Sequence, residues 1–208
     1  VEMLEAGFTG VCEFHYLHHD IDGRPYGDLA AMAGAIAQAA GETGIGLTLL
    51  PVFYRHGGFG LQAPGRGQRR FICNPELFQR LVAESRKVLA GLDDAVLGIA
   101  PHSLRAVGRE DLDLTVSLAG GGPVHLHIAE QEKEVADCLA WSGQRPVEWL
   151  LGQLPVDARW CLIHATHMSP AETRGLAAGG TVAGLCPVTE ANLGDGTFPT
   201  RDYLTVGG

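Results

Sequence analysis

The chain has 208 residues, of which 46% are apolar, and its formal net charge at pH 7 is −9. This size and composition suffice for one large folded domain. The acidic balance and the lack of a Lys/Arg-rich run argue against nucleic acid or an acidic membrane as partner, because both require clustered positive charge. We therefore expect a small-molecule substrate.

Apolar runs alternate with segments of helical periodicity along the chain. The first apolar run covers residues 7–14. A helix is expected after a cap at Asp28, because apolar side chains recur at three- and four-residue spacing, and Gly41 or Gly44 can end it. A second run at residues 47–53 is rich in strand formers and completes a β-α-β unit.

The same alternation continues to residue 186. Asn74 caps a second helix with proline at its first position, and an apolar stripe continues to Gly91. Ser169 and Glu172 show the spacing of a reciprocal helix cap. The other predicted strands cover 96–100, 123–128, 160–163 and 181–186, and the other predicted helices cover about 109–118 and 130–141.

Six predicted strands, each nearly continuous in apolar character, imply a parallel sheet covered by helices, as an open doubly wound sheet or a closed barrel. A barrel of this class has eight strands. Residues 1–6 read as a helix end, and no further apolar run starts at 205–208. We predict the α/β fold class. Residues 1–208 are interpreted as the central part, about strands 2 to 7, of one (β/α)8 TIM-barrel-type hydrolase domain, with strands 1 and 8 missing.

The five cysteines are odd in number, far apart and never arranged as Cys-x-x-Cys. This usage is typical of a reducing compartment rather than of a disulfide scaffold. No apolar stretch approaches the ~20 residues of a membrane-spanning helix, and the acidic opening lacks the basic start of a signal peptide. The sequence predicts a cytoplasmic protein.

Histidines follow three predicted strands, at His102, at His127 with His125 on the same strand face, and at His164. Chemistry in α/β barrels lies at the carboxyl ends of strands, so these residues should converge. Imidazole is a common Zn²⁺ ligand, and the carboxylate of Glu130 can move a proton from metal-activated water. A lone strand histidine is more often a hydrogen-bonded core residue, but three strand ends favour a metal hydrolase site.

Several neighbouring residues leave alternatives open. His164 can bind a metal or hydrogen-bond the attacking water, and His167 is expected to cap or line the loop. His102, Ser103 and Arg105 form either a solvated loop or, through Arg105, a bidentate site for a substrate carboxylate.

Two further segments receive structural interpretations. Residues 13–20 are crowded with potential ligands, but adjacent histidines point in different directions, so a polar loop after the first strand is favoured. The stretch Gly57–Gly60 shares only its glycine content with a phosphate-binding loop, and we expect a flexible loop at the barrel mouth.

Four blocks carry a family resemblance, at residues 100–107, 127–131, 160–167 and 186–196, and matches at 49–54 and 145–151 extend it. In these blocks the chain resembles the formimidoylglutamate deiminases of the amidohydrolase superfamily, nearly end to end. The resemblance implies a zinc-dependent (β/α)8 barrel that hydrolyses N-formimidoyl-L-glutamate to N-formyl-L-glutamate and ammonia in histidine degradation. A homodimer is also suggested.

The resemblance assigns roles to individual residues. It implies that His127 is a zinc ligand, that Glu130 is the proton shuttle, and that His164 orients and polarises the attacked C=N group. The residues that it implies for binding the glutamate part of the substrate are Tyr16, His102 and Arg105. Arg105 is the expected partner of a carboxylate.

The family takes its other zinc ligands from a His-x-His motif on the first strand and an Asp on the eighth. We expect the motif upstream of Val1 and the Asp shortly after Gly208. The isolated chain, with His127 alone among the ligands, is then expected neither to close its barrel nor to bind Zn²⁺ tightly. The sequence leaves open whether the bound ion is zinc or a substitute such as iron.

Two other functions compete. One is a different amidohydrolase, such as a deaminase of guanine-, cytosine- or adenosine-like rings or a chlorohydrolase. Arg105 with Tyr16 favours a carboxylate-bearing aliphatic substrate over a flat base. The other is a degenerate barrel that acts as a non-catalytic binding domain.

Overall fold

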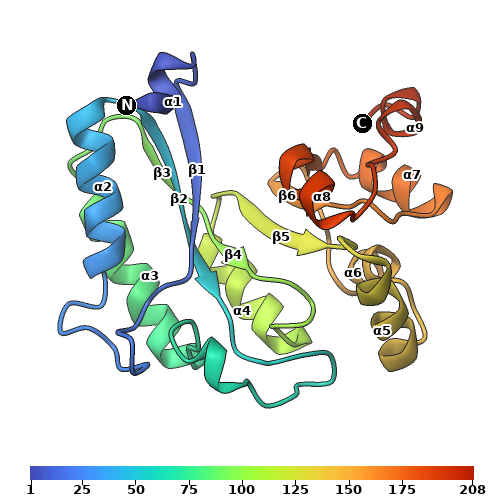
Figure 1. The fold of residues 1–208 in the computed structure, drawn as a ribbon, viewed down its shortest axis with the longest axis horizontal. Helices are drawn as coiled ribbons and strands as arrows, with labels where there is room; N and C mark the ends of the chain where they lie inside the picture. The colour runs from blue at the N-terminus through green and yellow to red at the C-terminus, as the bar shows by residue number, and fades with distance from the viewer.

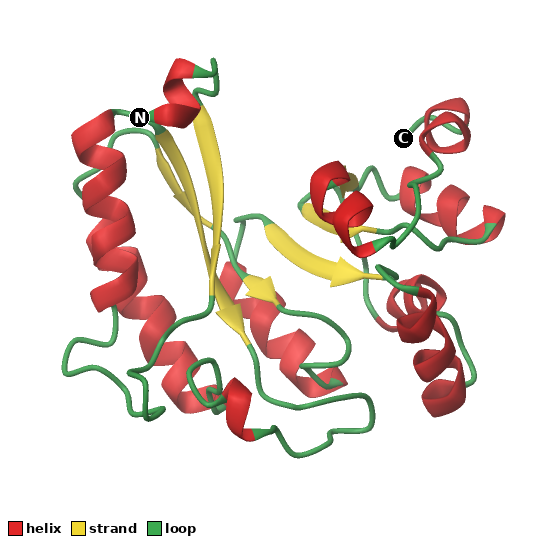
Figure 2. Cartoon of the chain, viewed as in Figure 1, coloured by secondary structure: helices red, strands yellow, loops and turns green.

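Strands and helices alternate along the chain in the computed structural model, which describes residues 1–208 (Figure 2). The strands are β1 (Gly10–His15), β2 (Gly46–Phe53), β3 (Ala95–Leu97), β4 (Ala100–Pro101), β5 (Val124–Ile128), β6 (Trp160–His164) and β7 (Val182–Gly184). The helices are α1 (Glu2–Glu5), α2 (Ala31–Thr43), the 3-10 helix η1 (Arg66–Gln68), α3 (Pro75–Leu89), α4 (Arg109–Ala119), α5 (Glu132–Ser142), α6 (Pro146–Gln153), α7 (Pro170–Ala178), α8 (Pro187–Leu193) and α9 (Thr200–Thr205).

All strand pairs are parallel. One sheet has the order β1-β2-β3 with β4 also paired to β2, and the other has the order β5-β6-β7. Single parallel bridges from Ile99 to Val124 and from Ser103 to His127 connect the two. The strands therefore form one series of six positions, with β3 and β4 sharing the third, and the prediction of six alternating parallel strands is confirmed.

The third position is interrupted at Gly98, where the neighbouring chains approach closely. A Cβ atom there would lie 2.6 Å from Leu50 Cδ2 and 2.8 Å from the Pro123 carbonyl oxygen. Only glycine fits such an approach without displacement of its neighbours. The predicted strand over residues 96–100 is thus two short strands.

Helices cover the outer side of the strands. Figure 1 shows α1 at the start of β1, α2 and α3 along β1 to β3, α4 beside β4, and α5 to α9 grouped around β5 to β7. The alternation predicted for β5 is confirmed: Leu126 and Ile128 are fully buried with residues of α5 and α6, whereas His125 and His127 are partly exposed. Full burial of one such aliphatic side chain contributes about 1.5–3 kcal/mol to folding, so this core fixes the register of the histidines.

The predicted caps of two helices are present. Asn74 Oδ1 accepts the N–H of Leu77 at 2.8 Å. Ser169 Oγ accepts the N–H of Glu172 at 3.3 Å, and Glu172 Oε2 accepts the N–H of Ser169 at 2.6 Å. Each bond satisfies an N–H that the first turn of a helix leaves free.

The predicted cap at Asp28 is wrong in position. Helix α2 starts at Ala31, and Asp28 Oδ1 accepts the N–H of Ala30 at 2.9 Å, so Asp28 stabilises the turn before the helix. Gly44 ends α2 with φ +74°, a conformation that glycine adopts at little cost.

Several elements differ from or extend the prediction. The last predicted strand, 181–186, is shortened to β7. Helix α6 was not predicted, although Pro146 at its first position and the bond from the Arg145 N–H to Glu148 Oε2 are sequence signals for it. None of the helices combines the length and the apolar character that crossing a bilayer requires.

Candidate active site

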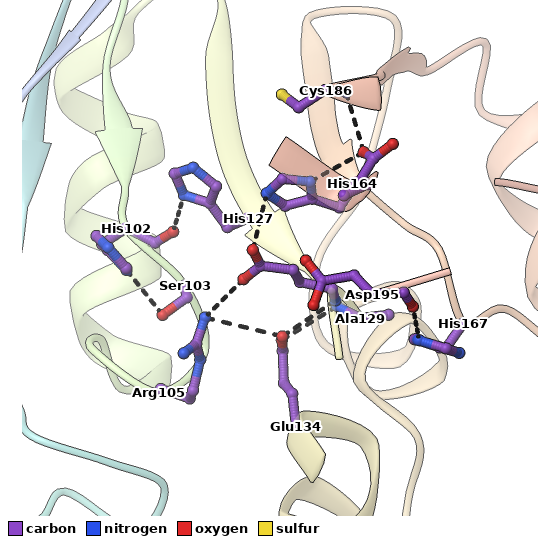
Figure 3. Close-up of polar contacts among 12 residues, drawn as sticks. His102, Ser103, Arg105, His127, Ala129, Glu134, His164, His167, Cys186 and Asp195 are labelled. Carbon is purple, nitrogen blue, oxygen red and sulfur yellow. Dashed lines mark hydrogen bonds and ion pairs between the residues drawn. The ribbon is translucent and has the colours of Figure 1, made fainter. Parts of the chain in front are cut away.

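The predicted site residues lie together at the carboxyl ends of β4, β5 and β6. Figure 3 shows the rings of His102, His127 and His164 close to one another, with Arg105 beside them. The centroids of the His127 and His164 rings are 5.6 Å apart, and those of His102 and His127 are 5.1 Å apart. The convergence expected from parallel strands is therefore observed.

His127 is held in one orientation by its backbone neighbour. Its Nδ1 donates to the carbonyl oxygen of His102 at 2.9 Å, whereas Nε2 makes no hydrogen bond. Burial lowers the pKa of His127 to about 4. The ring is therefore neutral at pH 7 and presents an unprotonated Nε2, which is the form that ligates metals.

His164 lies between two carboxylates. Its Nδ1 donates to Glu190 Oε1 at 3.0 Å, and its Nε2 lies 3.4 Å from Glu130 Oε1. The ring is buried, as is Glu190. The backbone of His164 has φ +69°, and Ala165 and Ala129 have φ +46° and +49°. Such values are uncommon outside glycine and cluster at functional sites, because the surrounding packing must enforce them.

Arg105 approaches Glu130 from the opposite side to His164. Its Nη2 lies 3.7 Å from Glu130 Oε2 and 3.8 Å from Glu134 Oε2, and its Nε is buried without a hydrogen-bond partner. Glu134 is buried, and burial raises the pKa of its carboxyl group. Arg105 thus retains a free donor beside the Glu130 carboxylate.

An aromatic wall borders the histidines. The ring centroid of Tyr16 lies 6.1 Å from that of His102, and the ring centroid of Tyr54 lies 4.5 Å from that of His102. The Nδ1 of His102 lies 3.0 Å from Ser103 Oγ, and burial lowers the pKa of His102 well below its ordinary value. The structure therefore brings Tyr16, His102 and Arg105 to the same mouth of the sheet as Glu130.

Two loop predictions need correction. The segment after β1 is a loop, as predicted, but its histidines are not in solvent: His18 and His19 are buried, and their Nε2 atoms lie 2.8 Å from the carbonyl oxygens of Val52 and Ile72. These bonds anchor the segment to β2 and to the long loop after it. The Gly57–Gly60 loop is likewise held in place, because Phe59 is buried and stacks on Trp141 with ring centroids 5.5 Å apart.

One group of three potential metal ligands lies within 4.8 Å, and it consists of His164, Cys186 and Glu190. It is a poor zinc site, because the His164 and Glu190 atoms are hydrogen-bonded to each other and burial raises the pKa of Cys186. His127 Nε2 fits a metal better, because its lone pair is free and its Nδ1 is already held by a carbonyl oxygen.

Sequence comparison places this geometry in a family. A sequence model described as the amidohydrolase family matches residues 1–208, the whole chain. The chain belongs to the amidohydrolase family.

Individual relatives agree with this placement. Over its full length this amidohydrolase is 55% identical to formimidoylglutamate deiminase of Pseudomonas aeruginosa and covers 46% of that protein. It is 35% identical to a 5-methylthioadenosine/S-adenosylhomocysteine deaminase of Halobacterium salinarum, covering 43% of it. The chain therefore spans less than half the length of these relatives.

Solved structures show the same fold. The crystal structure of an amidohydrolase from Brucella melitensis superposes with a TM-score of 0.98 at 63% identity, with all of this chain and 46% of that one covered. An adenosine deaminase from Xanthomonas campestris, with bound zinc, gives a TM-score of 0.77 at 22% identity over 99% of this chain and 41% of that one. The latter supports the α/β amidohydrolase fold alone.

Sequence reasoning missed two carboxylates of this amidohydrolase site. Glu134 lies four residues after Glu130, just inside the start of a predicted helix. A side chain at such a position can accept a backbone N–H that precedes the helix, so the sequence does contain a signal for Glu134. Glu190 is 26 residues from His164, and no local pattern connects them. His167 has the predicted loop role, since its Nε2 donates to the carbonyl oxygen of Asp195 at 2.6 Å.

Proposed function

We propose that the complete protein containing this chain hydrolyses N-formimidoyl-L-glutamate to N-formyl-L-glutamate and ammonia. The observation that carries the proposal is the position of Glu130, between the His164 imidazole and the Arg105 guanidinium. A carboxylate so placed can accept a proton from water and reach a group bound to Arg105. The 55% identity to the P. aeruginosa deiminase supports this substrate.

His127 is proposed as a zinc ligand through Nε2. Bound zinc supplies a lowered pKa for water and polarisation of the C=N bond. Two proteins of similar fold, an adenosine deaminase and an atrazine chlorohydrolase, have been solved with bound zinc. A tetrahedral site needs further ligands, which we propose lie outside residues 1–208.

The chain's own residues account for substrate binding and proton movement. Arg105 binds a carboxylate of the glutamate part, because its Nε is an unpaired buried donor. Tyr16 and His102 border the space beside Arg105 and contact the remainder of the glutamate part of the substrate. Glu130 takes the proton of the attacking water and gives it to the departing nitrogen, while His164 holds the reacting C=N group.

The chain is further proposed to belong to a larger barrel, a cellular compartment and an oligomer. We propose that residues 1–208 form about strands 2 to 7 of one (β/α)8 barrel, which the parallel series of six positions supports. A cytoplasmic location and a role in histidine degradation follow from the proposed substrate and from five cysteines without a disulfide. The family resemblance supports a homodimer.

Ammonia release by the purified, zinc-loaded complete protein tests the function. We expect release from N-formimidoyl-L-glutamate and none from guanine or 5′-methylthioadenosine. Release from a purine substrate alone would support a ring deaminase, which the H. salinarum relative makes the main competitor. No release from any of the three, with zinc bound, would support a non-catalytic binding domain.

A further inference from the structure

Glu190 is a buried carboxylate with two fixed contacts. It lies in α8, one turn after that helix starts, and only 5% of it is exposed. Its Oε1 accepts the backbone N–H of Cys186 at 2.9 Å and lies 3.0 Å from His164 Nδ1. The contact to Cys186 fixes the carboxylate relative to the backbone, so its position against His164 does not depend on a mobile side chain.

The contact fixes the protonation pattern of the imidazole. A carboxylate accepts hydrogen bonds and donates none when ionised, so the Nδ1 of His164 must carry the proton that points at Glu190. Nε2 is then the atom that faces Glu130, at 3.4 Å from its Oε1.

The three groups therefore form a row, Glu130, His164 and Glu190, with the imidazole in the middle. We propose that Glu190 is a positioning residue for the deiminase reaction, which sets the orientation and the Nδ1–H form of His164 so that Nε2 faces Glu130 and the reacting group. This inference rests on the proposed function. Among the residues proposed to act on the substrate, Glu190 contacts only His164.

A purely structural role of Glu190 as a helix cap is the competing explanation, and the chain contains a matched control for it. Glu172 is a buried glutamate whose Oε2 accepts the N–H of Ser169 at the start of α7. Its Oε2 also pairs with Arg145 Nε at 2.8 Å, its Oε1 accepts the N–H of Glu148 at 3.1 Å, and no histidine contacts it. Glu172→Gln thus reports the cost of neutralising a buried, hydrogen-bonded capping carboxylate that contacts no histidine.

The test is a double-mutant cycle in the complete zinc-loaded enzyme, with Glu190→Gln and His164→Asn as single changes. Asn is chosen at 164 because it tolerates φ +69° better than most residues. Glu190→Gln keeps an oxygen for the Cys186 N–H but removes the charge that orients Nδ1–H. We expect it to lower kcat about 10-fold or more while KM changes little.

In the His164→Asn background, Glu190→Gln should have almost no further effect, because the group through which it acts is gone. Glu172→Gln should leave kcat near that of the unchanged enzyme. Equal losses from Glu190→Gln in both backgrounds, or an unchanged kcat for the single variant, would overturn the positioning role. Full activity of His164→Asn would overturn it together with the role proposed for His164.

Nitrogen NMR of the histidine rings provides a readout that does not depend on activity. In the complete protein we expect His164 to carry its proton on Nδ1, and Glu190→Gln to shift the ring toward a mixture of forms. Glu172→Gln should leave the His164 signals unchanged. If the enzyme releases no ammonia from formimidoylglutamate but the NMR result is as expected, the proposed function fails and the Glu190 contact stands. A His164 ring protonated only on Nε2 would refute the contact directly.

Discussion

Glu134 holds the backbone of Glu130: its Oε2 accepts the Glu130 N–H at 3.1 Å, and its Oε1 accepts the preceding N–H of Ala129 at the same distance. Ala129 has φ +49°, so the turn that presents Glu130 is a strained one. The two bonds offset part of that strain and aim the Glu130 side chain between His164 and Arg105.

Glu134→Gln is expected to lower both stability and turnover. A glutamine offers one acceptor oxygen where the structure uses two, so one buried N–H loses its partner at a cost of about 1–3 kcal/mol. The thermal midpoint and kcat of the complete enzyme measure the effect. Glu132→Gln, at an exposed neighbouring position, is the control and should change neither. An unchanged midpoint for Glu134→Gln would show that the two hydrogen bonds of Glu134 are not needed for stability.

Glu130→Gln should separate metal binding from proton transfer. The amide matches the carboxylate in size but takes up no proton, so kcat is expected to fall by ~10²-fold or more, the usual effect of a positioned acid or base. Zinc content should stay the same, because His127 binds through its own Nε2. Metal analysis and ammonia release from the same preparation provide the comparison. Retained activity would mean that another group moves the proton.

Arg105→Lys is expected to weaken substrate binding more than it slows turnover. Lysine keeps the charge but lacks the planar pair of donors that a carboxylate matches. Loss of a charge-assisted hydrogen bond worth about 1.5–3 kcal/mol raises KM by about 10- to 100-fold. Arg80→Lys, on the exposed side of α3, is the matched control. A KM unchanged by Arg105→Lys would remove Arg105 from the substrate site.

Acid should destabilise the protein through His18. Burial, aided by the neighbouring His15 and opposed by the hydrogen bond to the Val52 carbonyl, lowers the pKa of His18 to about 3. Below the unfolded pKa of about 6.5, the unfolded chain takes up a proton that the folded chain refuses. Stability is therefore complete above that pH and falls as pH decreases, by roughly 2 kcal/mol between pH 6.5 and 5.

The substitution His18→Gln tests this sign. Thermal midpoints at pH 7 and pH 5 should differ less in the variant than in the unchanged protein, because glutamine does not titrate. The variant also loses packing at pH 7, so the difference between the two pH values is the informative quantity. The same difference in both proteins would show that His18 is protonated without cost.

Zinc affinity of residues 1–208 expressed alone should be weak. Of the ligands proposed for zinc, this stretch supplies His127, and a single imidazole does not hold the ion against water. Titration with zinc in the presence of a metal indicator measures the affinity. Tight uptake of one ion per chain would refute the proposal that ligands outside this stretch are needed.

The order of elements was accessible from the sequence because it depends on local signals. Apolar periodicity, the Asn74 cap and the Ser169–Glu172 box each involve neighbours within four residues, and the structure confirms them. The grouping of His127 with His164 also followed, since parallel strands carry their ends to one edge. The family blocks added the expected role of each residue.

Tertiary structure alone decided the contacts between distant segments. Glu190 reaches His164 across 26 residues, and His18 reaches the Val52 carbonyl oxygen across 34. Whether a polar residue is solvated or buried depends on what packs over it, and a linear pattern does not contain that information. For the same reason residues 13–20 were predicted only as a polar loop, whereas the fold buries His18 and His19 against β2 and the loop after it.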